Sequence, residues 1–266
     1  MEDTAVMKQT ISLGQMDVKL GDPEANWRTV QTMTAEAARR GSDLVVFPEL
    51  WSTGYDLENA EKYATPTGEG MFSQLADLAK AHQIGILGSC LSLVGEGQFG
   101  NTAVYFDKNG RSLGEYSKLH LFRLMQEEQF LTAGSHTTFI ETAWGKAGLT
   151  ICYDLRFPEL FRQYALAGAQ LVFVPAEWPH PRLNHWRTLL RARAIENQMF
   201  IVACNRVGSS KGTDFFGHSC ILDPWGEIVL ELGEGEMLGT AEIDIAQVDA
   251  VRAKIPVFAD RRDDVY

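Results

Sequence analysis

Short apolar runs alternate along the chain with longer segments whose apolar residues follow helical spacing. Two of the short runs, at residues 43–47 and 171–175, are apolar almost throughout, which is typical of strands buried on both faces. The longer segments place apolar residues three and four positions apart, as amphipathic helices do. They predict helices at residues 23–40, 71–82, 158–167 and 184–197.

Turn signals divide most of the remaining apolar segments into paired strands. Asn109-Gly110, between residues 99–106 and 112–116, is a strong hairpin signal, and Trp144-Gly145 separates strands at 137–141 and 146–151. Single strands are predicted at residues 10–16, 84–93, 200–205, 215–222, 228–232 and 238–243, with a short helix from about residue 245. Residues 117–134 form a long irregular segment.

The order of these elements forms two similar halves, each with strands and covering helices. This order fits an α/β fold of the α-β-β-α sandwich type. A doubly wound parallel sheet is the alternative, but the hairpins argue against it because hairpins join antiparallel strands. No linker or change of composition interrupts the chain, so we expect one domain over residues 1–266.

Charge and cysteine usage narrow the class of protein. The formal net charge of −11 over 266 residues argues against a nucleic-acid surface and against binding to an anionic membrane. The N-terminus begins acidic and lacks the apolar core of a signal peptide, and no run of about 18 apolar residues occurs, so a cytoplasmic protein is expected. The four cysteines have no metal-binding spacing, which predicts free thiols and no metal site.

Three ionisable residues each follow a predicted strand, where sites gather in α/β proteins. They are Glu49, Lys118 and Cys152. Together they suit acyl transfer: a thiol that attacks a carbonyl carbon, a carboxylate that takes its proton, and an ammonium that stabilises the oxyanion. Taken singly, each has a plainer interpretation as a surface carboxylate, a solvated lysine or a buried structural thiol.

Longer motifs around these residues identify a family. The chain resembles the nitrilase superfamily of carbon–nitrogen hydrolases over nearly its whole length. The resemblance rests on FPEL, YSKLHLF, ICYDLRFPE, RARAIENQ, GHS and the final DRRDDVY. The segments HLFRLMQEEQFLTAG and PAEWPHPR are most similar to the ω-amidase branch, whose members hydrolyse the side amide of α-keto acid amides.

The resemblance assigns roles by position. It implies that Glu49 is the general base, Lys118 the oxyanion stabiliser and Cys152 the nucleophile. The superfamily also has a second glutamate seven residues before a glycine, which here is Glu127 before Gly134. Glu128 is the rival if the register shifts by one.

Several further residues are candidates for substrate binding. Tyr153 is valued for its backbone N–H, and Tyr55 is expected to cover the site. Glu177 and Trp178 follow the strand at 171–175 and could line the pocket, although a core position for Trp178 is equally open. Arg156 could bind a substrate carboxylate; a structural ion pair, for instance with Glu159, is the favoured interpretation.

These assignments imply a hydrolase that cleaves a small carboxylic amide to acid and ammonia through a cysteine thioester. The ω-amide of an α-keto acid is the first choice of substrate, and no metal or organic cofactor is required. An N-carbamoyl amine or amino acid is the alternative, because the same groups cleave a ureido C–N bond. A nitrile substrate, or an inactive member kept as a binding partner, is less favoured.

Family resemblance also implies a homodimer that packs the helices after the nucleophile into a four-layer sandwich. Those helices are at residues 158–167 and 184–197, and Leu160, Phe161 and Tyr164 on the first are expected to supply an apolar two-fold patch. The tail from about residue 256 is expected to reach across to the partner subunit.

Overall fold

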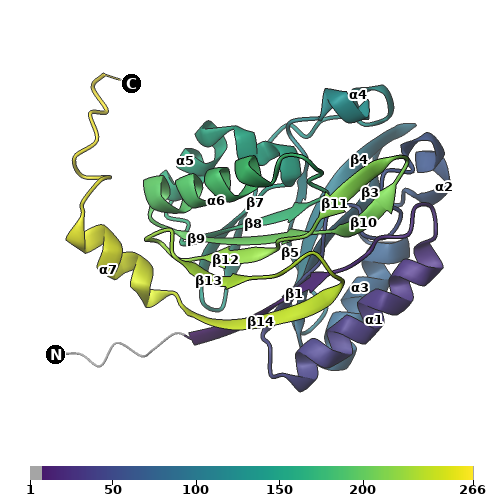
Figure 1. Cartoon of the computed structure of the whole chain (residues 1–266), viewed down its shortest axis with the longest axis horizontal. Coiled ribbons are helices and arrows are strands. Elements are labelled where there is room, and N and C mark those ends of the chain that lie inside the picture. The colour runs from purple at the N-terminus through teal and green to yellow at the C-terminus, as the bar shows by residue number, and fades with distance from the viewer. Residues whose placement is uncertain (1–7, 266) are drawn as a thin grey trace.

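Two six-stranded sheets pack face to face, with helices on their outer sides, in the computed structural model, which describes residues 8–265 (Figure 1). The first sheet comprises β1 (Lys8–Gln15), β2 (Leu44–Val46), β3 (Gly85–Gly95), β4 (Gln98–Phe106), β5 (Ser112–Ser117) and β14 (Met237–Asp244). The second comprises β6 (Phe139–Thr142), β7 (Gly145–Leu149), β8 (Leu171–Ala176), β9 (Phe200–Asn205), β12 (Cys220–Leu222) and β13 (Ile228–Glu231).

The two sheets repeat one arrangement, with parallel strands at the centre and antiparallel strands at the margins. The orders are β14-β1-β2-β3-β4-β5 and β13-β12-β9-β8-β7-β6. In the first sheet β1, β2 and β3 run parallel, while β4 pairs antiparallel with both β3 and β5; in the second sheet β7, β8 and β9 run parallel. The predicted α-β-β-α sandwich is therefore confirmed, and the doubly wound alternative is wrong.

Helices cover the outer face of each sheet. The α-helices are α1 (Pro23–Arg39), α2 (Ala60–Tyr63), α3 (Gly70–His82), α4 (Glu127–Phe130), α5 (Pro158–Leu166), α6 (Leu183–Asn197) and α7 (Ala246–Lys254). Helices α1 and α3 lie on the first sheet, and α5 and α6 on the second (Figure 1). Short 3-10 helices are η1 (Leu57–Asn59), η2 (Arg123–Met125) and η3 (Cys152–Arg156).

The main core lies between the two sheets. Leu13 and Val46 from the first sheet belong to the same buried cluster as Phe173 from the second, and the rings of Tyr105 and Phe173 are 5.9 Å apart across the layers. Cys90, Cys204 and Cys220 are free and buried, as expected of small core residues.

One of the predicted strands is interrupted in the structure. The predicted strand 215–222 is two strands, of which β11 (Thr213–Phe216) pairs with β10 (Val207–Ser210) and β12 joins β9. Gly217 and His218 between them have φ of 71° and 53°, a left-handed conformation that ends a strand. The later strand β14 pairs with β1, so it closes the first sheet rather than the second.

The predicted dimer patch on α5 is wrong in its residues. Leu160, Phe161 and Tyr164 are buried against the sheet of their own chain, since they form the inner face of the helix. The apolar side chains exposed on this layer are Leu166 and Ile195, at 46% and 50%.

The tail after α7 begins against its own subunit. The Phe258 ring lies 5.4 Å from the Arg162 guanidinium of α5, and the following residues extend away from the sandwich (Figure 1).

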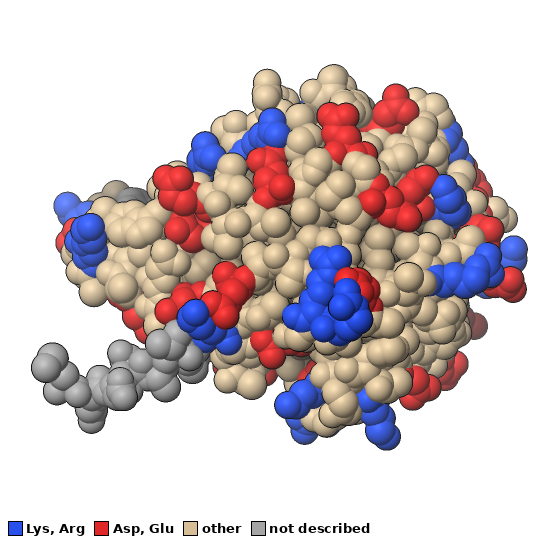
Figure 2. Space-filling model, turned by 60° about the horizontal axis from the view of Figure 1, so that its bottom comes forward, with Lys and Arg blue, Asp and Glu red and all other residues tan. Residues whose placement is uncertain are grey.

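Acidic and basic side chains are interspersed over the face in Figure 2. Within residues 8–265, no helix is both long and apolar enough to cross a lipid bilayer. The prediction that the chain does not begin with a signal peptide concerns residues 1–7, which lie outside the described part.

Candidate active site

The ends of four strands bring together three of the predicted catalytic residues and one predicted substrate-binding residue. Glu49 follows β2, Lys118 follows β5, Cys152 follows β7 and Glu177 follows β8. Three of these strands are the short, buried, central ones, and they end on the same side of the sandwich. A polar residue follows each strand at that end, where a site can form without interrupting the core.

Lys118 links two carboxylates. Its Nζ lies 2.7 Å from Glu49 Oε1 and 2.6 Å from Glu127 Oε1, and all three side chains are fully buried. Burial alone would lower the pKa of Lys118, but the negative charges of Glu127 and Glu49 outweigh it and raise the pKa. Lys118 therefore keeps its charge, which compensates the two carboxylates away from water.

Tyr55 and Asn101 complete this cluster. The Tyr55 hydroxyl is a hydrogen-bond donor to Glu49 Oε1 at 3.0 Å and to Glu127 Oε1, and Asn101 Nδ2 donates to Glu49 Oε1 at 2.7 Å. The expectation that Tyr55 covers the site is wrong, because its hydroxyl lies between the charged groups instead. Asn101 was not predicted, since a polar residue within a strand gives no sign of its burial.

The second glutamate is Glu127 and not Glu128. Glu127 is fully buried and accepts a hydrogen bond from the Phe122 N–H at 3.0 Å, whereas Glu128 is exposed. Gly134 fixes this register: its N–H donates to the Lys118 carbonyl at 2.9 Å, and a Cβ on it would lie 2.1 Å from the Ser117 carbonyl oxygen. Only glycine allows this close approach beside Lys118.

Cys152 starts the short helix η3 in a left-handed conformation, with φ of 46°. The residue is 5% exposed, and its thiol lies close enough to the Glu49 carboxylate to sense its charge. Burial and the negative charge of Glu49 raise the thiol pKa, while Lys118 opposes this shift. At neutral pH Cys152 is therefore a thiol, and a base would have to take its proton for the sulfur to act as a nucleophile.

Asp154 holds the turn that carries Cys152. Its Oδ2 accepts hydrogen bonds from the Ile151 N–H at 2.9 Å and the Tyr116 hydroxyl at 2.7 Å. Its Oδ1 accepts from the His120 N–H at 3.1 Å and lies 2.7 Å from His120 Nδ1. The carboxylate thus joins the nucleophile turn to β5 and to the segment after Lys118, a role that the sequence did not reveal.

A small cavity, of about 10 Å³, opens onto Cys152. It is lined by Phe122, Cys152, Tyr153, Arg156, Glu177, Trp178, Pro179 and Arg182. The structure therefore places the predicted substrate-binding residues here, Tyr55 excepted. Trp178 also packs on Trp186, so it both lines the cavity and belongs to the core, as the two interpretations from the sequence proposed. Phe122 and Arg182 were not predicted, although Arg182 lies in the PHPR segment.

Arg156 faces this cavity. Its guanidinium carbon lies 4.7 Å from the Trp178 ring centroid, and Nη2 is 3.5 Å from His185 Nδ1. Within residues 8–265 no carboxylate forms an ion pair with it. The favoured structural ion pair with Glu159 is therefore wrong, since η3 turns the Arg156 side chain into the cavity.

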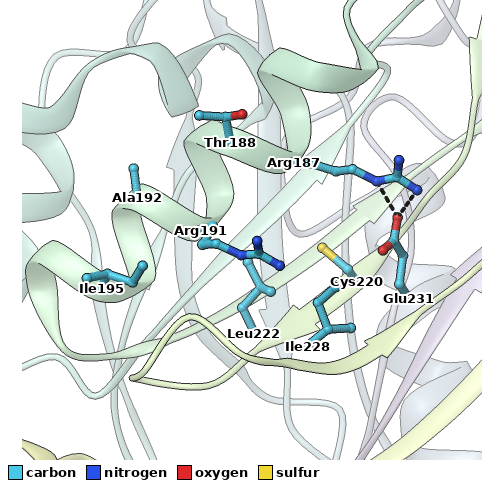
Figure 3. Close-up of a pocket in the computed structure, with 9 residues that line it drawn as sticks. All are labelled: Arg187, Thr188, Arg191, Ala192, Ile195, Cys220, Leu222, Ile228 and Glu231. Carbon is cyan, nitrogen blue, oxygen red and sulfur yellow. Dashed lines mark hydrogen bonds and ion pairs between the residues drawn. The ribbon is translucent and has the colours of Figure 1, made fainter.

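A larger hollow, of about 550 Å³, lies between α6 and the strands β12 and β13 (Figure 3). Arg187 bridges to Glu231 across one end of it at 2.6 Å, and Cys220 and Ile228 form its floor. This hollow contains a thiol but no neighbouring carboxylate–lysine pair, so the acyl-transfer groups are found at the smaller cavity. In the described part of the chain, no group of three or more His, Cys, Asp or Glu is arranged to hold a metal ion.

Comparisons with known proteins agree with this geometry. The carbon–nitrogen hydrolase family model matches residues 10–253. A 2-oxoglutaramate amidase of Bacillus subtilis is 43% identical over 260 residues, which cover 98% of this chain and 100% of that protein. A carbon–nitrogen hydrolase of Xanthomonas campestris, with an arsenic adduct in its active site, superposes with a TM-score of 0.90 at 30% identity, covering 97% of this chain and 99% of that one.

A third relative has a modified nucleophile. It is a mutant amidase of Nesterenkonia sp. AN1, in which the acetamide moiety of fluoroacetamide is covalently added to the active-site cysteine. It superposes with a TM-score of 0.86 at 28% identity, covering 97% of this chain and 95% of that one.

Proposed function

The chain belongs to the carbon–nitrogen hydrolase family, and we propose that it hydrolyses the ω-amide of an α-keto acid to the corresponding dicarboxylic keto acid and ammonia. As a member of this family it is a hydrolase of carbon–nitrogen bonds other than peptide bonds. The observation that carries the proposal is the Cys152 thiol, which lies beside Glu49 and Lys118 and opens onto a cavity lined by two arginines.

In the proposed reaction Glu49 takes the thiol proton while the Cys152 sulfur attacks the amide carbonyl carbon. The oxyanion is stabilised by Lys118 and by the Tyr153 N–H. Lys118 Nζ has three hydrogens, of which two serve carboxylates and the third faces the Tyr55 hydroxyl at 3.3 Å. That last, longest contact is the one that a substrate oxygen replaces.

Glu49 then returns the proton to the substrate nitrogen, the C–N bond breaks and ammonia leaves. A water molecule, deprotonated by Glu49, attacks the thioester carbon, and the carboxylic acid and the thiol are restored. Glu127 keeps Lys118 in place throughout, because both of its oxygens accept hydrogen bonds from the protein.

The two arginines support an α-keto acid as the acyl group. Arg156 and Arg182 line the cavity, and burial together with the positive charge of Arg182 lowers the pKa of Arg156. Two guanidinium groups that repel each other favour an anion between them, such as the carboxylate at the far end of the substrate. The similarity to a 2-oxoglutaramate amidase supports the same choice.

Ammonia release from a panel of substrates tests this proposal. The panel comprises 2-oxoglutaramate, 2-oxosuccinamate, glutamine, asparagine, an N-carbamoyl amino acid and an aliphatic nitrile. We expect a kcat/KM for a keto-acid amide at least about 10-fold above the values for the amino acids. The alternative function predicts that the N-carbamoyl compound is the best substrate.

A cysteine pair provides the matched control. Cys152→Ala should abolish turnover, whereas Cys220→Ala removes a buried thiol in β12, outside the cavity that Cys152 faces, and should retain it. Undiminished ammonia release by the Cys152→Ala variant would contradict the mechanism.

We further propose that the chain functions as a homodimer in the cytoplasm. Apolar side chains exposed on the α6 layer and beside it support a second copy of the chain as the partner. They are Leu166, Ile195, Trp225, Ile228 and Val229. Four free thiols suit a reducing compartment.

A further inference from the structure

One buried carboxylate oxygen at the site has no hydrogen-bond partner among residues 8–265. It is Oε1 of Glu177, a side chain that is 1% exposed. Glu49 and Glu127 accept hydrogen bonds on both of their oxygens, and Glu177 Oε2 accepts one from Arg206 at 3.1 Å. An acceptor that is buried without a partner is unusual in a folded protein and indicates a ligand or a functional constraint.

The orphaned oxygen belongs to a residue that lines the Cys152 cavity. The backbone N–H of the same residue donates to Glu49 Oε2 at 2.9 Å, so the Glu177 side chain begins directly beside the proposed base. Asn101 Oδ1 is also without a partner, but Asn101 is not one of the cavity-lining residues.

Arg206 fixes how the Glu177 carboxylate is turned. Its guanidinium is fully buried, donates to the Val18 carbonyl at 2.6 Å and to the Val207 carbonyl at 3.1 Å, and lies 4.4 Å from the Phe215 ring centroid. Because Arg206 is held on several sides, it binds one oxygen of the Glu177 carboxylate and leaves the other, Oε1, free.

A primary amide needs such an acceptor. Its carbonyl oxygen receives hydrogen bonds from Lys118 and the Tyr153 N–H, but its nitrogen carries two N–H donors. Both oxygens of Glu127 already accept hydrogen bonds from the protein, and Glu49 has to receive the thiol proton. We propose that Glu177 Oε1 accepts a hydrogen bond from the substrate amide nitrogen, and that this contact makes the site select amides over esters.

This inference rests on the proposed function, because it places the scissile amide at Cys152. In the reaction the contact holds the leaving group while Glu49 delivers the proton to the same nitrogen, and it is released with ammonia. An ester of the same acid has no N–H in that position and gains nothing from Glu177.

The variant Glu177→Gln tests the contact sharply. Arg206 can only donate, so the glutamine turns its carbonyl oxygen to Arg206 and its NH₂ group to the cavity. A donor then faces the substrate N–H in place of an acceptor. With the best amide of the substrate panel and its methyl ester, we expect kcat/KM to fall about 100-fold for the amide and less than about 3-fold for the ester.

Ester hydrolysis serves as the internal measure that the variant is folded and its nucleophile competent. Trp178→Phe is the matched variant: it alters a neighbouring cavity residue that has no acceptor to offer the substrate nitrogen, and it should change amide and ester hydrolysis by similar factors.

Equal falls for the two substrates in Glu177→Gln would overturn the proposal in favour of a structural role. Unchanged amide hydrolysis would overturn it too, because it would show that a donor serves at this position. A wild-type chain that hydrolyses neither substrate would contradict the proposed function, and this inference with it, whereas the other two outcomes leave that function intact.

Discussion

At the scale of single residues, Glu177 couples the stability of the fold to pH. Burial raises the pKa of its carboxyl from 4.5 to about 7, although Arg206 opposes the shift. A carboxyl with a raised pKa binds its proton more tightly in the folded state. Its contribution to stability is therefore complete below the unfolded pKa and is lost as the pH rises through about 7.

This shift predicts that Glu177 lowers the free energy of unfolding by up to about 3 kcal/mol between pH 4.5 and pH 8. Urea unfolding at a series of pH values should show that the free energy of unfolding falls less steeply with rising pH for Glu177→Gln, because the glutamine has no proton to lose. Glu159→Gln, an exposed glutamate at the start of α5, should follow the wild-type slope. Parallel curves for wild type and Glu177→Gln would show that the carboxyl titrates normally.

The chemistry of the individual residues explains which members of the candidate site could be predicted from the sequence. Glu49, Lys118 and Cys152 were predicted because each belongs to a motif and suits a recognisable step of the proposed reaction. Asn101 and Arg206 were missed because their importance comes from burial against Glu49 and Glu177, which are distant in the chain. Burial of a polar side chain is a tertiary property that local sequence does not encode.

At the scale of elements, Asp154 clamps the nucleophile turn η3 to β5. Its two oxygens receive hydrogen bonds from Ile151, Tyr116 and His120. Asp154→Asn replaces one acceptor by an NH₂ group that faces donors, and leaves buried donors unpaired. We expect a loss of about 3 kcal/mol in the free energy of unfolding. We also expect a lower kcat, because the turn fixes the backbone of Cys152.

Urea unfolding and ammonia release by the same preparation measure the two effects. Asp249→Asn makes the same chemical change on the exposed face of α7 and should alter neither quantity. Wild-type stability in Asp154→Asn would mean that the turn holds without the clamp.

Most element positions followed from the sequence, and the failures have identifiable causes. Helix α1 begins where Asp22 and Pro23 predict, and the Asp22 side chain accepts from the Ala25 N–H at 2.9 Å. The break at Gly217 and His218 was missed because the two apolar runs on either side of Gly-His-Ser were taken as one strand, whereas the backbone between them turns left-handed. Strand β14 was predicted from its apolar run, but its pairing with β1 was not, because that pairing joins strands near the two ends of the described chain.

At the scale of the whole molecule, the two repeated halves place the site at one edge of both sheets. Glu49 and Lys118 come from the first sheet, and Cys152 and Glu177 from the second. The charged cluster therefore spans the interface between the layers, and the packing of sheet on sheet sets its geometry. Sequence motifs could order these residues along the chain, but only the sandwich brings the ion pair of Lys118 and Glu49 next to the thiol.

The proposed homodimer is the prediction that belongs to this scale. Helices α5 and α6 cover the second sheet on their inner side, while Ile195 on α6 is 50% exposed and borders the hollow in Figure 3. Sedimentation velocity at micromolar concentration should give the mass of two chains for the wild type. Ile195→Glu should weaken the association by about 100-fold or more, because each copy would bury an unpaired carboxylate in a two-fold interface.

A control substitution on the other sheet shows whether the effect depends on the position of the new charge. Val94→Glu introduces the same charge at a residue that is 43% exposed at the end of β3, on the other sheet, and should leave the dimer intact. Because Ile195 is half exposed within its own chain, its replacement should scarcely change the fold of one subunit, so a loss of mass would report on association alone. A wild type that sediments as a single chain, or an Ile195→Glu variant that stays dimeric, would contradict the assignment of this layer as the interface.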